Sequence, residues 1–148
     1  NVRWCLELKS MASINEGTWF AYQLTVTESG RTRSDPTIEK YTVQKIEGQN
    51  VLVQKEINGK DVGQFNTTRG HGSCVFDMAS LSKRGSENMN TGFGHMYVNI
   101  FESAGDGESE RIFLGKDNIV FRDIRTRKKS DDVLITETRE LCWTSMKL

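Results

Sequence analysis

The segment 69–74, Arg-Gly-His-Gly-Ser-Cys, has the residue types that come nearest to a catalytic pattern. A cysteine nucleophile needs a base within hydrogen-bond reach and a third group that orients this base. His71 and His95 are the two histidines of the chain, so few pairings with Cys74 are open. No oxyanion-hole pattern surrounds Cys74, which begins an apolar alternation with Phe76. We therefore expect a buried thiol or one half of a disulfide here, and we predict that the protein is not an enzyme.

Metal ligation has little support in the sequence. Three Cys and two His lack the paired short spacings of a structural zinc site. Asp106, Glu108 and Glu110 stand at i, i+2 and i+4, a spacing at which oxygen ligands can hold calcium in a loop. The further Gly and bidentate Glu of an EF-hand are not in place. We interpret these acidic residues as a solvated hairpin tip and predict no metal and no cofactor.

The charges of the chain balance, with 20 basic and 20 acidic side chains and a formal net charge of zero. A protein that binds nucleic acid or an anionic membrane surface would be expected to carry an excess of Lys and Arg, so we predict no nucleic-acid partner. A basic run could dock an acidic partner or a sulfated polysaccharide, but a charged loop that keeps a strand edge soluble is the simpler interpretation. The run consists of Arg122, Arg125, Arg127, Lys128 and Lys129.

Residues 17–27 carry the longest clean strand signal in the chain. Phe20, Tyr22, Leu24 and Val26 recur with a period of two, which directs one apolar row to one face of a sheet. These residue types fit a pleated, half-buried surface. We therefore predict that this segment is the central strand of the fold.

Turn signals every eight to twelve residues divide the rest of the chain into short strands. The pattern predicts an all-β fold with one domain over residues 1–148, an antiparallel β-barrel or a two-layer β-sandwich of eight to ten short strands. A polar loop is expected over 82–92 and a charged loop over 125–131. Further strands are expected over 2–9, 38–46, 51–56, 60–66, 74–81, 93–102, 109–114, 119–124 and 132–143.

Gly17-Thr18-Trp19 resembles the Gly-x-Trp opening of the lipocalins. The resemblance implies an eight-stranded barrel that carries a small apolar ligand, with Arg139 as the arginine that packs over the tryptophan. The Thr-Asp-Tyr type turn of that family and the helix that follows its barrel are not found in this sequence. The simpler interpretation is that Trp19 closes one end of the core.

The hairpin signal Asn58-Gly59 allows two registers. A three-residue loop over 57–59 with Gly59 in the left-handed region sets Glu56 opposite Lys60, whereas a two-residue turn sets Glu56 opposite Asp61. The second register opposes two like charges. We therefore predict the three-residue loop.

The two ends of the chain each carry a Cys beside a Trp, Trp4-Cys5 and Cys142-Trp143. Two terminal strands that pair would remove the free edges of a meander, and they would bring Cys5 and Cys142 together. We predict a disulfide between Cys5 and Cys142, with Cys74 as a buried free thiol. The alternatives are a bridge between Cys74 and Cys142, or no bridge.

No nucleophile–base pair, metal set or phosphate loop emerges, so the sequence favours a non-enzymatic exported domain that acts through protein–protein contacts. The alternative is a lipocalin-like barrel with a small apolar ligand, for which Trp19, Tyr22 and Tyr97 are the candidate contact residues. No apolar run approaches about 18 residues, so no transmembrane segment is predicted. The first residue is Asn1 rather than Met, which is compatible with a removed export signal, and we expect a secreted, periplasmic or cell-surface location.

Overall fold

The computed structural model describes residues 14–33 and 35–148, which form one antiparallel sheet with the order β5-β4-β3-β1-β10-β9-β8-β7-β6, while β2 pairs with β1 outside this path. This confirms the prediction of an all-β antiparallel fold. The sheet is open, with β5 and β6 at its two ends. No helix of the described residues is long and apolar enough to span a bilayer. The strands are β1 (Trp19–Glu28), β2 (Arg31–Thr32), β3 (Thr37–Glu47), β4 (Asn50–Ile57), β5 (Lys60–Thr68), β6 (Ser82–Thr91), β7 (Gly94–Gly105), β8 (Glu108–Leu114), β9 (Val120–Ser130) and β10 (Val133–Thr144), with the 3-10 helix η1 (Lys116–Asn118) between β8 and β9.

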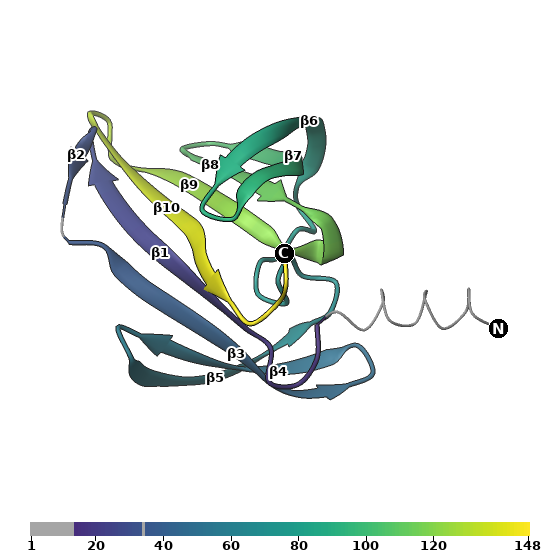
Figure 1. Cartoon of the computed structure of the whole chain (residues 1–148). Helices are drawn as coiled ribbons and strands as arrows, with labels where there is room; N and C mark the ends of the chain where they lie inside the picture. Colours follow the sequence, from purple (N-terminus) through teal and green to yellow (C-terminus); the bar gives the residue numbers. More distant parts are fainter. Residues whose placement is uncertain (1–13, 34) are drawn as a thin grey trace.

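The strands β1 and β10 lie side by side in the middle of the sheet, so the segment predicted to be central is central. Figure 1 shows the sheet bent into two arms, β3–β5 on one side of this pair and β6–β9 on the other. We call the face with Phe20 and Tyr22 the inner face. The opposite face, which carries Trp19 and Ala21, is the outer face, because successive side chains of a strand alternate.

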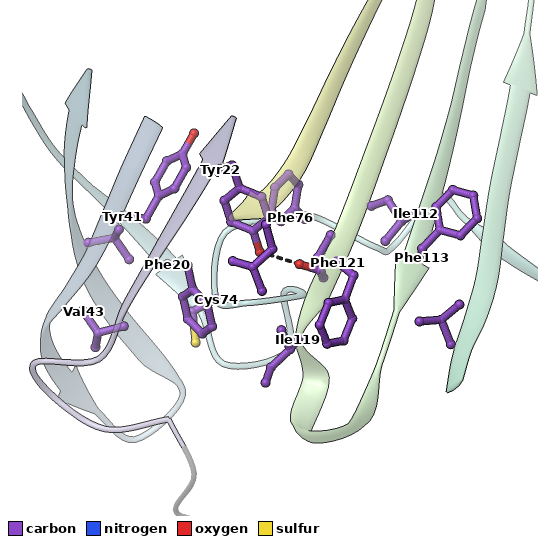
Figure 2. Close-up of a cluster of buried hydrophobic side chains, with 14 of the residues drawn as sticks. Phe20, Tyr22, Tyr41, Val43, Cys74, Phe76, Ile112, Phe113, Ile119 and Phe121 are labelled. Atoms are coloured by element: carbon purple, nitrogen blue, oxygen red, sulfur yellow. Dashed lines mark hydrogen bonds between the residues drawn. The ribbon is translucent and has the colours of Figure 1, made fainter. Parts of the chain in front are cut away.

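Residues 69–81 connect the two edge strands and cross the inner face; we call this segment the crossover plug. Cys74 and Phe76 are each only 2% exposed, and the Phe76 ring packs edge-to-face on Tyr22 with 5.1 Å between the ring centroids. Gly72 lies against Val120 so closely that a Cβ atom at this position would overlap the Val120 side chain. The plug therefore supplies the second layer of the core, as Figure 2 shows.

The core is a continuous cluster of buried side chains from both arms and the plug. Burial of one large apolar side chain stabilises a fold by about 1.5–3 kcal/mol, so this cluster is the main source of stability. Its fully or almost fully buried members include Phe20, Tyr22, Tyr41, Val43, Val51, Val53, Cys74, Phe76, Ile112, Ile119 and Val120.

Three loop and strand assignments from the sequence are wrong. Residues 82–92, predicted as a polar loop, are mostly the edge strand β6, and the charged residues 125–131 mostly extend β9. Edge strands and strands with two solvated faces lack the apolar alternation that marks a strand in the sequence. Residues 74–81 alternate like a strand but form the plug, in which Ser73 and Cys74 both have positive φ angles, 50° and 57°.

The turn at Asn58-Gly59 also differs from the prediction. Glu56 pairs with Asp61, so the connection is the two-residue turn and the expected three-residue loop is wrong. Asn58 and Gly59 both have positive φ, 50° and 81°, which gives the turn whose twist matches the flanking strands. The like-charge pair is tolerated because Asp61 accepts a hydrogen bond from the Gly63 N–H at 2.8 Å, next to a bulge in β5.

The prediction that the two terminal strands pair and leave no free edge is wrong, because both neighbours of β10 are other strands and the sheet is open. β10 is flanked by β1 and β9, and the free edges belong to β5 and β6. The predicted strand over 2–9, including Cys5, lies outside the described residues.

Candidate binding surfaces

Tyr22, one of the three candidate contact residues, belongs to the core. Its hydroxyl donates to the Val120 carbonyl at 2.7 Å, and it lies 2.7 Å from the Ser73 hydroxyl. Ser73 Oγ in turn accepts the Val120 N–H at 2.8 Å. The three groups therefore close a ring of hydrogen bonds that joins β1, the plug and β9, and burial raises the pKa of Tyr22 far above its usual range. Tyr22 is a structural residue and is not accessible to a ligand.

Trp19 lies on the outer face, where it helps to form a groove of about 280 Å³. Trp143 on β10 is 58% exposed and stands beside this groove, since it pairs with Ala21. The Lys40 ammonium lies over the Trp19 ring at 4.6 Å from its centroid. We call this surface the tryptophan groove; it is lined by Trp19, Ala21, Ile38, Lys40, Glu56, Gly59 and Trp143.

Tyr97, the third candidate, is 64% exposed on β7. It lines a different hollow of about 410 Å³, together with Met96, Leu114, Phe121 and Leu148 among others. The structure therefore distributes Trp19, Tyr22 and Tyr97 over three separate environments and does not assemble them into one site.

The arginine expected over the tryptophan has another role. Arg139 lies on the inner face, where its Nε donates to Glu39 Oε1 at 2.7 Å, and the Tyr41 hydroxyl donates to the same oxygen at 3.0 Å. The side chains of Arg139 and Glu39 are 13% and 4% exposed. Burial acts to raise the pKa of Glu39, but the hydrogen bond and charge of Arg139, followed by the charge of Lys55, hold it below its usual value. The pair is a buried ion pair of the inner face.

Asp123 on β9 lies next to this pair, and its side chain is fully buried. Arg125 Nε is 3.2 Å from its Oδ2, yet no described residue donates a hydrogen bond to either of its carboxyl oxygens. Burial and then the hydrogen bond with Glu110 raise the pKa of Asp123 to about 8, against the charge of Arg125. Burial therefore favours the protonated, uncharged form of the Asp123 carboxyl group.

The basic run does not form a basic patch. Its residues lie on β9, so their side chains alternate between the two faces. Arg122 Nε lies 2.9 Å from Glu140 Oε1, Arg125 pairs with Glu110 at 2.9 Å, and Lys129 Nζ lies 3.3 Å from a Glu28 oxygen. Most of the positive charge is therefore neutralised within the sheet.

Cys74 and His71 lack the geometry of a nucleophile and its base. The contact between them that the structure records is a backbone hydrogen bond, from Cys74 N to the His71 carbonyl at 2.8 Å. Burial raises the pKa of the Cys74 thiol, which disfavours the reactive thiolate. His71 Nδ1 instead lies 2.6 Å from the Thr67 hydroxyl.

Cys74 is a buried free thiol, as predicted, and Cys142 is free as well, so the alternative bridge between these two residues is not formed. The Cys142 Sγ donates to the Ala21 carbonyl at 3.2 Å. A free Cys142 speaks against the predicted Cys5–Cys142 disulfide as well. Cys5 itself lies outside the described residues.

The acidic residues of the β7–β8 hairpin divide between two environments. Asp106 is exposed in the turn, whereas Glu110 faces inward and pairs with Arg125. Across residues 14–33 and 35–148, no group of three His, Cys, Asp or Glu side chains is arranged to hold a metal ion. The interpretation as a solvated tip therefore fits Asp106 and not Glu110.

The sequence analysis missed Glu39 and Asp123, two buried charged residues with shifted pKa values, and it gave their neighbour Arg139 another role. In each strand these charged residues occupy positions on the inner face, but a charged residue in a strand is normally expected on the solvated face, so the alternation gave no sign of their burial. The spacing of Asp123 and Arg125, two residues apart on one face, was the available signal.

No protein-family model and no curated protein matches this chain. Among solved structures, a "putative exported protein with YmcC-like fold" from Bacteroides fragilis is similar with a TM-score of 0.50 and 11% identity, over 88% of this chain and 96% of that one. A DUF1329 family protein from Desulfovibrio piger is 5% identical with a TM-score of 0.31, over 99% and 91% of the two chains. The first likeness concerns the fold alone, and the second is too low to define a shared fold.

Proposed function

We propose that this chain is an exported, non-enzymatic domain that acts through protein–protein contacts, and that its tryptophan groove binds a second copy of the chain. The observation that carries this proposal is the position of Trp143, a 58% exposed tryptophan beside a groove on the same surface. A surface that holds both a projecting side chain and a groove can be complementary to itself, as a two-fold interface requires. Export is supported by the description of the Bacteroides fragilis protein with a similar fold.

The charged residues that line the tryptophan groove are also compatible with a second copy of the chain as the partner. Lys40 and Glu56 lie opposite each other on β3 and β4, and both line the groove. A two-fold axis through the groove would set Lys40 of one copy against Glu56 of the other. The zero net charge of the chain adds no long-range repulsion between copies.

A lipocalin-like carrier of an apolar ligand is the weaker candidate. Such a carrier needs a roomy apolar interior that a ligand can enter. Here the sheet is open, and the plug residues Cys74 and Phe76 occupy the apolar part of the inner face.

Sedimentation velocity over a concentration series tests the proposal. We expect a reversible dimer, and we expect Trp143→Ala to weaken it at least about 30-fold, since a tryptophan hot spot contributes about 2 kcal/mol or more. Tyr97→Ala removes an aromatic side chain of similar exposure from another surface and is the matched control. A wild-type protein that stays monomeric at all concentrations, or a Tyr97→Ala variant that weakens the dimer equally, would contradict the proposal.

A charge exchange tests the two-fold geometry. Lys40→Glu alone should weaken the dimer, and adding Glu56→Lys should restore it, because both intermolecular pairs then re-form with reversed charges. A double variant that is weaker than either single variant would speak against this arrangement.

A further inference from the structure

A second surface of the molecule, distinct from the tryptophan groove, carries charged side chains that make no contact needed for the fold within the part of the chain that the structure describes. A hollow of about 670 Å³ lies on the inner face over β7–β10, beside the plug residue Ser80; we call it the inner hollow. Two rows of paired residues cross its floor. The first row is Ser103, Glu110, Arg125 and Glu137, and the second is Gly105, Glu108, Arg127 and Ile135.

The first row is internally neutralised. Arg125 is ion-paired with Glu110 at 2.9 Å and with the buried Asp123 at 3.2 Å, and Glu137 lies 3.3 Å from Arg139. These side chains hold one another in place, so they can position a ligand but have little charge left for it.

The second row is different. Arg127 and Glu108 face each other across β8 and β9, and neither forms an ion pair or a side-chain hydrogen bond with any residue that the structure describes. A guanidinium and a carboxylate, both without a partner, thus stand side by side at the floor of a hollow. The hollow falls in the size range of small-molecule sites, about 300–1,000 Å³.

We propose that the inner hollow binds a small carboxylate that carries a hydrogen-bond donor on the neighbouring carbon. Arg127 takes the carboxylate in a two-pronged contact, for which the planar guanidinium is suited. Glu108, which accepts hydrogen bonds only, takes the donor. The donor is an ammonium or a hydroxyl group, so the ligand is an α-amino acid or an α-hydroxy acid. Glu108 disfavours the binding of a simple anion, and Arg127 disfavours the binding of a simple cation. The hydroxyl groups of Ser80 and Ser103 can contact the rest of the ligand.

Four probes of nearly equal size test this chemistry by amide NMR titration of the whole chain: L-alanine, L-lactate, propionate and L-alaninamide. We expect saturable shifts on β8 and β9 with alanine, lactate or both, and the difference between these two identifies the donor. Propionate lacks the donor and alaninamide lacks the carboxylate, so each should bind about tenfold more weakly or worse. Equal binding of propionate, or no saturable shift with either alanine or lactate, would overturn the proposal.

Variants separate this site from general charge effects. Arg127→Ala and Glu108→Ala should each abolish the saturable shifts, and because both side chains are exposed they should leave the fold unchanged. Lys128→Ala removes the same charge from the adjacent residue on the other face of the strand and should bind like the wild type. A loss of binding in Lys128→Ala equal to that in Arg127→Ala would also overturn the proposal. The inner hollow lies on the inner face and the tryptophan groove on the outer face. The result of the NMR titration is therefore independent of dimer formation through the tryptophan groove.

Discussion

The two ends of the inner face bury their side chains in different ways. At one end the crossover plug fills the space above the sheet with Cys74 and Phe76, and water is excluded by packing. At the other end buried charges compensate one another around Arg139, beside an open hollow. The same strands serve both ends: β3 carries Val43 in the core and Glu39 in the charged cluster. The sheet itself does not determine what its inner face holds; the presence or absence of a covering segment does.

This difference predicts the largest loss of stability at the charged end. Arg139→Ala leaves Glu39, which is 4% exposed, with a buried charge that has lost its closest partner. Removing one member of a buried ion pair costs about 3–5 kcal/mol. Urea unfolding at neutral pH measures the loss. The double variant Glu39→Leu with Arg139→Met should recover much of it, and a double variant no more stable than Arg139→Ala would refute the charge-compensation account.

At the apolar end, Phe76→Ala should cost a similar or slightly smaller amount, about 3–5 kcal/mol, through the cavity left beside Tyr22. Phe76→Leu retains most of the volume and should lose clearly less. Thermal unfolding of the two variants gives the comparison. If both cost under about 1 kcal/mol, the plug does not act as the second layer of the core.

Tyr22→Phe removes one hydroxyl from the ring of hydrogen bonds that joins the plug to the sheet. The Val120 carbonyl and the Ser73 hydroxyl then lose a partner while they remain buried. The expected loss is about 1–3 kcal/mol, with the aromatic packing retained. Equilibrium unfolding measures it, and Tyr97→Phe, an exposed tyrosine on β7, is the control that should change little.

The last prediction concerns the pH dependence of the free energy of unfolding. The pKa of Asp123 is raised by burial to about 8, so the folded protein binds a proton that the unfolded chain has released above about pH 4. The stability that this proton contributes is full below the unfolded pKa and is lost as the pH rises through about 8. Asp123→Asn should therefore match the wild type near pH 4 and become increasingly more stable than it toward pH 8. Parallel stability curves for the two proteins would show that Asp123 is ionised in the fold.

The fold class followed from the sequence because Phe20, Tyr22 and Leu24 alternate with more polar residues. This alternation marks a strand with one apolar face and one more solvated face. The polar edge strand β6 could not be found in this way, since neither of its faces forms much of the core. The plug was misassigned for the opposite reason. Cys74 and Phe76 alternate as in a strand, but they bury their side chains through turns with positive φ rather than through a pleat.

The candidate sites were harder to predict than the fold. Trp19 was identified, but its partner Trp143 was expected beside a disulfide, because the pairing of β1 with β10 is a long-range property. The cluster around Asp123 draws on four strands, β3, β8, β9 and β10, and each contributes a charge that is unremarkable in its own segment. Such a site exists only through the register of the sheet, which the single sequence leaves open.

The path of the chain through the sheet has a kinetic consequence. Within each arm, consecutive strands pair through short turns, so both arms consist of local hairpins. The arms meet through β1 and β10, where Phe20 pairs with Thr144, and through the plug that spans the two free edges. Contacts between residues so distant in the sequence raise the contact order, and chains with high contact order fold slowly. We therefore expect the pairing of β1 with β10 to limit the folding rate. Until these strands pair, each arm exposes one additional unpaired edge.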